Sequence, residues 1–203
     1  VCSSDLTQTP GENAQRYFAK YNKQKRTFEA LTELIQETAD DIQYLESISN
    51  ALDIALSEAD LAQIKEELMQ SGYIRRKHTK KKVKLTSKPM HYISSDGYDM
   101  YVGKNNLQNE ELTFSFANGN DWWFHAKGAP GSHVIVKSGG DELPDRTFEE
   151  AGRLAAYYSK NRGADKVEID YIQKKHVKKP NGAKPGFVVY YTNYSLVIDR
   201  KST

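Results

Sequence analysis

The chain has 203 residues, of which 38% are hydrophobic and 28% charged, and its formal net charge is +2. No apolar run approaches the roughly 20 residues that a helix needs to cross a bilayer, so membrane insertion is not expected. The single cysteine, Cys2, cannot form an internal disulfide, and the first residues lack the basic and apolar regions of a signal peptide. We therefore expect a cytoplasmic protein.

The small net charge hides an asymmetry between the two parts of the chain. Residues 1–70 contain 6 Lys or Arg and 13 Asp or Glu, a net of −7. Residues 71–203 contain 23 Lys or Arg and 14 Asp or Glu, a net of +9. Such a split indicates an acidic arm attached to a basic module. The basic module is the part that we expect to bind a polyanion.

The sequence predicts one long helix from Pro10 to about Leu56. Thr9 can cap this helix, Pro10 fits its first position, and Glu12 can close a capping box. At ~1.5 Å per residue the helix should be roughly 70 Å long. Apolar or tolerant residues recur at alternating steps of four and three, which is typical of a coiled-coil seam: Tyr17, Tyr21, Gln24, Phe28, Leu31, Ile35, Thr38, Ile42, Leu45, Ser49, Leu52 and Leu56.

A seam of this kind needs a partner, and the chain contains no second helix of comparable length. Two alternatives follow. An antiparallel helix precedes this chain in the natural protein, or two copies form a parallel dimer through the Tyr17 to Leu56 seam.

Ser57 is predicted to cap a second, short helix, with Leu61, Ile64 and Leu68 on one face and Gly72 just past its end. Residues 75–88 then hold eight Lys or Arg and no acid. This run is either a solvated linker or a phosphate-binding loop, because lysines release the counterions of a nucleic acid. We assign residues 1–72 to the arm and exit helix, 73–88 to a basic linker, and 89–203 to a compact module.

From Met90 onward the pattern changes to the two-residue period of strands. "HYISSDGYDMYVGK" predicts a hairpin that turns at residues 95–97, and "ELTFSF", "DWWFHAK" and "SHVIVKS" predict three further strands. "LPDRTFEEAGRLAAYYSKNRG" predicts a helix capped by Asp145 or Thr147 and ended by Gly163. Strands return in "KVEIDYIQKKHVKK" and "GFVVYYTNYSLVID". The fold class is therefore α+β, a long N-terminal coiled-coil helix followed by a mixed module with a mainly antiparallel sheet and one principal helix.

The stretch "DWWFHAKGAPGSHVIVK", residues 121–137, contains both tryptophans of the chain. On a strand Asp121, Trp123 and His125 share one face and Trp122 lies on the other, so one tryptophan is expected to be buried. His125 and His133 flank a turn and should approach each other if the strands pair.

Catalysis is not expected from this stretch. Ser132 and His133 are neighbours on a strand, so their side chains point to opposite faces and do not form a dyad. The scattered histidines and Cys2 do not supply a metal site, and no cofactor motif is present.

Three loops offer candidate contacts with an anion or with RNA. Residues 128–131 form either a tight hairpin turn or an anion nest beside His125 and Lys127. "VGKNNLQNEEL" is rich in amides that can contact base edges or form turns. The third loop mixes cations and aromatic rings, a composition that suits unpaired RNA although tyrosine is also a common strand residue: Lys174, Lys175, His176, Lys178, Lys179, Lys184, Tyr190, Tyr191 and Tyr194.

The segment "YVGKNNLQNEELTFSFANGNDWWFHAKGAPGSHVIVK" resembles NFACT-R, the carboxy-terminal RNA-binding module of the NFACT family. "NAQRYFAKYNKQKRTFEAL", "YLESI" and "IKEELMQSGYI" are similar to the second arm and exit of that family's coiled-coil middle section. The resemblance covers nearly the whole chain from Asn13. Its Asp-x-Trp-x-His and Pro-Gly-Ser-His elements occur in the expected order.

The resemblance implies binding to large ribosomal subunits obstructed by peptidyl-tRNA, contact with tRNA or rRNA, and, in bacteria, support of alanine tailing. It also implies that the family's amino-terminal module is absent here, so this chain alone is not expected to elongate a tail. Some streptococcal members are described as fibronectin-binding adhesins that reach the cell surface without a signal peptide. The residues expected to bind RNA are Arg75, Arg76, Lys80, Lys81, Lys82, Lys104, Asn105, Asn106, Asp121, Trp123, His125, Lys127, Gly131, Ser132, His133, Lys174, Lys175, Lys178 and Lys184.

Overall fold

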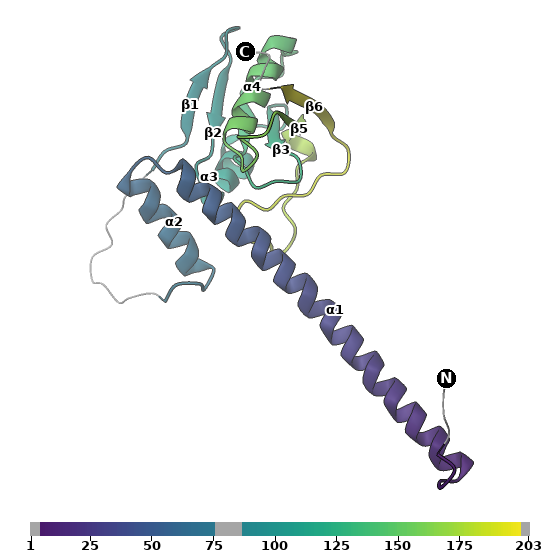
Figure 1. Cartoon of the computed structure of the whole chain (residues 1–203). Helices are drawn as coiled ribbons and strands as arrows, with labels where there is room; N and C mark the ends of the chain where they lie inside the picture. The colour runs from purple at the N-terminus through teal and green to yellow at the C-terminus, as the bar shows by residue number, and fades with distance from the viewer. Residues whose placement is uncertain (1–4, 76–86, 200–203) are drawn as a thin grey trace. The chain divides into compact units, whose positions relative to one another are not determined.

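The computed structural model describes residues 5–75 and 87–199. The chain divides into two compact units, Val1–Gln43 and Tyr44–Thr203. The predicted long helix is present as α1 (Pro10–Ile54), which forms most of the first unit and continues into the second (Figure 1). At its start the backbone N–H of Thr9 donates to Glu12 Oε2 (2.8 Å) and the N–H of Glu12 donates to Thr9 Oγ1 (3.3 Å). This reciprocal capping is the one that the sequence predicts.

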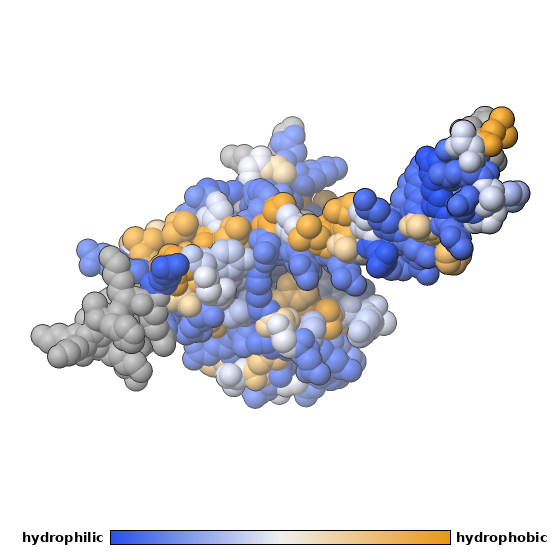
Figure 2. Space-filling model, turned by 90° about the horizontal axis from the view of Figure 1, so that it is seen from below, coloured by the Kyte–Doolittle hydropathy of each residue, from blue (hydrophilic) through white to orange (hydrophobic). Residues whose placement is uncertain are grey.

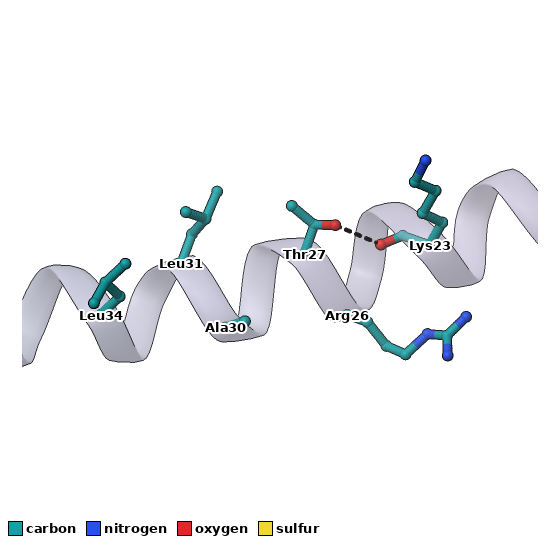
Figure 3. Close-up of a pocket in the computed structure, with 6 residues that line it drawn as sticks. All are labelled: Lys23, Arg26, Thr27, Ala30, Leu31 and Leu34. Atoms are coloured by element: carbon teal, nitrogen blue, oxygen red, sulfur yellow. Dashed lines mark hydrogen bonds between the residues drawn. The ribbon is translucent and has the colours of Figure 1, made fainter.

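In the first unit the predicted seam is an exposed apolar stripe. The side chains of Phe28 and Ile35 are 72% and 68% exposed, and Tyr21, Leu31 and Ile42 are exposed as well. Figure 2 shows hydrophobic side chains, in orange, at several places along the extended helix α1. A shallow hollow on α1 is lined by residues of that helix alone, and its Lys23, Thr27 and Leu31 project from one side (Figure 3).

The second unit begins where α1 packs on α2 (Glu58–Gln70). Tyr44, Ile48 and Ala51 form a small core with Ile64 of α2. Ser57 caps α2 in a capping box with Asp60, as predicted, and Gly72 follows the helix with a φ of +82°. Leu61, which the sequence places on the buried face with Ile64, is instead 49% exposed.

A six-stranded sheet forms the centre of the module. Its order is β1 (Met90–Ile93), β2 (Asp99–Val102), β4 (Val134–Val136), β3 (Trp122–Ala126), β5 (Lys166–Gln173) and β6 (Tyr194–Asp199). All five strand pairings are antiparallel, as expected for the α+β class. The β1–β2 hairpin turns at the predicted place, and its Gly97 has a φ of +89°.

The segment "ELTFSF" is not a strand, which corrects the sequence prediction. It belongs to α3 (Asn106–Glu111) and to a π-helical turn, η1 (Leu112–Phe116). The buried residues from the N-cap of α3 to η1 follow helical spacing: Asn105, Asn106, Gln108, Asn109, Leu112 and Thr113. Because four of these six are amides, a search for apolar periodicity does not detect the helix.

The principal helix is α4 (Asp145–Tyr157), which lies against one face of the sheet (Figure 1). Its N-cap is Pro144, so neither Asp145 nor Thr147 caps it. Thr147 instead donates from its hydroxyl to Asp96 Oδ2 (2.8 Å). The helix ends before Gly163 because the following backbone pairs with residues 130–132: Lys160 N–H donates to the carbonyl of Pro130 (2.9 Å).

Two of the predicted C-terminal strands are shorter than expected. β5 ends at Gln173 and is followed by a 3₁₀ turn, η2 (Lys174–His176). In "GFVVYYTNYSLVID" only β6 joins the sheet, while Val189 makes an isolated bridge with Lys178.

The sheet separates two cores. Phe124, Ala126, Val134 and Val136 pack under α4, and Trp123, Ile135 and Ile172 pack on the other face with Leu112 and Val177. Within the described residues no helix is long and apolar enough to cross a membrane.

Candidate nucleic-acid interface

The two adjacent tryptophans lie on opposite faces of the sheet. Trp123 is fully buried, with Ile135 and Ile172 as its register partners on β4 and β5. Trp122 is half-buried, and its ring meets that of Phe148 at 4.9 Å and 80°. Trp123 is therefore the core anchor, and the Nε1–H of its indole is buried without a hydrogen-bond partner.

His125 and His133 do come together, as the hairpin prediction requires. Their ring centroids are 5.4 Å apart with the rings perpendicular. His133 is buried, its Nδ1 lies 2.8 Å from Thr113 Oγ1, and its backbone N–H donates to Asn109 Oδ1 (2.9 Å). These contacts fix His133 in the interior beside Trp123, and His125 lies half-buried next to both rings.

Burial keeps both histidines neutral. It lowers the pKa of His125 to about 4 and the pKa of His133 well below its ordinary value, with the neighbouring His125 adding to the second shift. Neither ring therefore supplies a positive charge to an anion near neutral pH. Among residues 5–75 and 87–199, no group of three His, Cys, Asp or Glu is placed to hold a metal ion.

The amide-rich segment is part of the interior. Asn105 caps α3 through its side chain, which accepts from the backbone N–H of Gln108 (2.9 Å). The Nδ2 of Asn106 donates to Ser47 Oγ (2.7 Å) and to Glu67 Oε1 (2.8 Å). Asn105 and Asn106 are 2% and 7% exposed, so their side chains are not available to contact base edges. Their role in the structure is to join α1 and α2 to the module.

Lys104 is also occupied within the protein. Its Nζ lies 2.6 Å from Asp60 Oδ1, and the two side chains are 13% and 1% exposed. Burial by itself raises the pKa of Asp60, but hydrogen bonds from Lys104, Ser87 and the backbone of Leu56 outweigh it and hold that pKa below its ordinary value. This buried pair ties α2 to the loop before α3.

Asp121 and Ser132 are buried as well, which leaves six of the predicted RNA contacts inside the protein: Asn105, Asn106, Asp121, Trp123, Ser132 and His133. Asp121 Oδ2 lies 2.5 Å from Lys137 Nζ, and it accepts the backbone N–H of Asn118 (2.7 Å). The prediction that these six side chains touch RNA directly is therefore not compatible with the folded module. They build the scaffold under the surface.

The turn at residues 128–131 is bound to the end of α4. Gly131 bridges to Ser159, and a Cβ at Gly131 would lie 3.1 Å from Ser159 Cβ. Gly128 has a φ of +63°, which glycine adopts at little cost. The hairpin-turn interpretation is therefore sufficient for these glycines, and anion binding at this turn stays a prediction.

Two further lysines are exposed or half-buried but engaged. Lys127 Nζ lies 2.6 Å from Glu168 Oε1 across β3 and β5. Lys184 Nζ lies 4.5 Å from the ring centroid of Tyr44 and 5.2 Å from that of Tyr73. Lys184 therefore holds the loop before β6 against α1 and the segment after α2.

The lysines at η2 differ from these. Among the residues that the structure describes, Lys174, Lys175 and Lys178 form no ion pair with an acid, and Lys175 and Lys178 are exposed. Arg75 is exposed at the end of a described range, whereas Arg76, Lys80, Lys81 and Lys82 lie outside the described residues. Lys174 and Lys175 of η2, with Lys178 just after it, are thus cations of the predicted RNA-binding set that have no acidic partner among the described residues, and we call these three the η2 lysines.

Aromatic residues that the sequence did not single out lie beside η2. Lys174 Nζ is 5.8 Å from the ring centroid of Phe114, and Lys137 Nζ is 4.8 Å from that of Phe116. The sequence predicts a strand for the segment that contains Phe114 and Phe116, whereas in the structure both lie in the helical turn η1. Their spacing alone gives no signal for a surface role.

The fold and the site define a basic α+β module carried on a long helical arm. A family model described as the NFACT protein RNA binding domain matches residues 88–191, and one described as the NFACT N-terminal and middle domains matches residues 4–87. The chain belongs to the NFACT family, as its motifs predict.

Curated relatives match along almost the whole chain. The Rqc2 homolog RqcH of Streptococcus suis strain 05ZYH33 is 47% identical over 92% of this chain and 33% of that protein. The Rqc2 homolog RqcH of Bacillus subtilis strain 168 is 42% identical over 94% of this chain and 33% of that protein. This chain thus spans about a third of the length of these relatives.

A solved structure has the same fold. The C-terminal part of the fibronectin/fibrinogen-binding protein from Streptococcus suis is 44% identical, with a TM-score of 0.85. The match covers 96% of this chain and 77% of that one.

Proposed function

We propose that this chain is the RNA-binding part of a ribosome quality-control factor. The observation that carries the proposal is the match of residues 88–191 to the NFACT RNA-binding domain. The lysines without acidic partners at η2 support it, because counterion release by lysine drives binding to a phosphate backbone. One relative, the ribosome quality control complex subunit NEMF homolog of Drosophila melanogaster, carries this function in its name and is 35% identical over 34% of this chain.

The finer part of the proposal concerns the whole protein. The intact factor binds obstructed large ribosomal subunits in the cytoplasm, contacts tRNA or rRNA and supports alanine tailing of the stalled chain. This module contributes binding rather than catalysis or a cofactor. Ser132 and His133 are both buried, and burial lowers the pKa of His133.

The arm has a separate part in this proposal. Its exposed seam in α1 pairs with an antiparallel helix of the intact protein, or with a second copy of the chain. The exposed side chains of Phe28 and Ile35 support pairing, because a seam with this spacing buries both on association.

A salt titration of RNA binding tests the function. The logarithm of the affinity should fall linearly with the logarithm of the salt concentration, with a slope set by the number of phosphates neutralised. Charge reversal of Lys174, Lys175 and Lys178 should weaken binding and reduce the slope. No RNA binding at low salt, or a flat slope, contradicts the proposal.

Co-sedimentation with stalled large ribosomal subunits tests the partner. The variant K80E/K81E/K82E alters the basic linker, and K174E/K175E/K178E alters η2. Comparison of the two shows which stretch carries the contact. If both variants and the parent chain fail to sediment with the subunits, the ribosomal partner is wrong.

A second candidate function is binding to fibronectin at the cell surface. It is favoured by the likeness to the Streptococcus suis fibronectin/fibrinogen-binding protein. Surface plasmon resonance with immobilised fibronectin decides it. Saturable binding at physiological salt supports the adhesin function, whereas binding that modest salt removes indicates only general charge attraction.

A further inference from the structure

A row of three aromatic residues and one isoleucine crosses one face of the sheet, buried at one end and exposed at the other. Trp123 on β3, Ile135 on β4, Tyr101 on β2 and His91 on β1 are register partners in sequence across four strands. They therefore share one face of the sheet. At the Trp123 end the row is fully buried, and at the His91 end it is exposed.

At the exposed end the rings contact one another in a continuous series. His91 stacks on Tyr101 with centroids 4.7 Å apart and an interplanar angle of 18°. Tyr101 meets Phe116 at 4.7 Å and 67°. Phe116 is 41% exposed, and the ring of Tyr101 that it contacts packs against the core around Trp123. We call the rings of His91, Tyr101 and Phe116, together with Phe114, which packs against the same core as Tyr101, the aromatic strip.

The strip is bordered by lysines. Lys137 lies over the ring of Phe116 and Lys174 over that of Phe114. The backbone N–H of Lys175 donates to the carbonyl of Gly119 (3.0 Å), which holds η2 beside the loop that follows η1. Strip and η2 lysines are thus parts of one surface.

The charge of this surface is positive. Asp121 is buried and paired with Lys137. The exposed Asp99 carboxylate lies 2.7 Å from His91 Nε2 and is the acid beside the strip. The charges of Lys174, Lys175 and Lys178 are not matched by acids among the described residues. Aromatic rings that pack on a sheet and lie beside lysines without acidic partners are the features of a surface on which bases stack.

We propose that the aromatic strip and the η2 lysines bind unpaired nucleotides of a single-stranded or looped RNA. The inference deepens the proposed RNA binding and rests on it. Only unpaired bases present a free face to an exposed ring, because in a duplex each base is stacked between its neighbours. Lysine borders also favour RNA over a protein partner, since protein interfaces are depleted in lysine.

The test compares a short single-stranded RNA that contains 2-aminopurine with a duplex of the same length, by fluorescence anisotropy on the full chain. F116L keeps the apolar bulk and removes the ring, and H91A removes an exposed ring without touching the core. Each should weaken single-strand binding by about 5- to 100-fold, as base stacking on an aromatic residue predicts, and reduce 2-aminopurine quenching. Duplex binding should stay unchanged.

Matched controls separate stacking from charge and from folding. Y191L removes a ring that is 86% exposed but lies outside the strip, and it should have no effect. K175E should weaken both single-strand and duplex binding, while K166E, at the other end of β5, should weaken neither strongly. Thermal unfolding shows whether F116L is folded. If F116L is not folded, the single-strand binding of H91A decides the proposal.

The outcomes are distinct. If F116L or H91A binds single strands as the parent chain does while K175E binds weakly, RNA binding stands and the stacking platform is wrong. Equal or tighter binding of the duplex by the parent chain also overturns the platform. If the parent chain binds neither RNA at low salt, the proposed RNA-binding function is wrong as well. Saturable binding to fibronectin in surface plasmon resonance, weakened by F116L, would then assign the surface to that protein instead.

Discussion

Lys104 and Asp60 form an ion pair with an Nζ–Oδ1 distance of 2.6 Å, and both side chains are largely shielded from solvent. Asp60 also accepts the backbone N–H groups of Leu56 and Ser57 (both 3.0 Å) and the hydroxyl of Ser87. One carboxylate thus caps α2 and anchors the loop before α3. Polar contacts thus hold the exit helix against the RNA-binding module.

Removing the lysine of this pair should strongly destabilise the protein. K104M leaves the Asp60 carboxylate buried without its cation, and we expect the free energy of unfolding to fall by about 3–5 kcal/mol in urea denaturation. K127M breaks an exposed pair with Glu168 and should cost at most about 1 kcal/mol. Equal effects of the two substitutions would contradict the structural role of Lys104.

The same pair predicts an effect of acid. Because the folded state lowers the pKa of Asp60, its stabilising contribution is present above the unfolded pKa of about 3.9 and is lost as the pH falls through the folded pKa. The stability difference between the parent chain and K104M should therefore narrow in strong acid.

The histidine pair predicts a loss of stability at milder acidity. The folded state keeps His125 and His133 neutral, whereas the unfolded chain binds their protons below about pH 6.5. With the pKa of His125 lowered to about 4, the free energy of unfolding should fall by about 2–3 kcal/mol from neutral pH to about pH 4 from this residue alone. H125Q should flatten this slope.

H91A is the control, because His91 is exposed and lies outside the interior pair. H91A should retain the acid-dependent loss of stability that H125Q removes, because the contacts of His125 and His133 are unchanged in it. If H91A flattens the dependence of the unfolding free energy on pH and H125Q does not, the attribution of this dependence to His125 is wrong.

Glu67 should act in the opposite direction. Burial raises its pKa, its Oε1 accepts from Tyr44 and Asn106, and its Oε2 has no partner. The folded state therefore favours the protonated acid, so this contribution is present in acid and is lost as the pH rises through the folded pKa. E67Q resembles the protonated form, and at pH 8 it should be more stable than the parent chain.

The advantage of E67Q should disappear toward pH 4, where Glu67 itself is protonated. Urea denaturation at several pH values measures it. E66Q, at the neighbouring half-buried position, is the comparison. If E67Q is less stable than the parent chain at every pH, the carboxylate form is the one that the fold requires.

The exposed seam of the arm predicts association. In sedimentation velocity the chain should self-associate as its concentration rises, or bind an added antiparallel arm, because Phe28 and Ile35 are buried on pairing. F28E/I35E should abolish this, while E33K, an exposed change off the seam, should not. If the chain stays monomeric at high concentration and does not bind an added arm, the prediction that the seam mediates association is wrong.

Much of the fold follows from local patterns. The capping residues Thr9 and Ser57 and the hairpin turn at Gly97 lie where the sequence places them, and α4 lies within the segment that predicts it. The error at residues 111–116 arises because the helix that leads into them, α3, carries its buried period on amides rather than on apolar residues. The misplaced end of α4 arises because its backbone pairs with residues 130–132, a contact that no local signal shows.

The sequence by itself determined the long helix, the antiparallel module and the family, because helix-forming runs, strand alternation and motif order are local properties. Only the tertiary structure decided which cations remain available. Lys104 and Lys184 are engaged by Asp60 and Tyr44, residues far away along the chain, whereas Lys175 and Lys178 are not matched by an acid. It also decided that Trp123 is the buried tryptophan and that Phe116 reaches the surface. The physical reason is that charge pairing and burial depend on neighbours in space, which the order of residues does not specify.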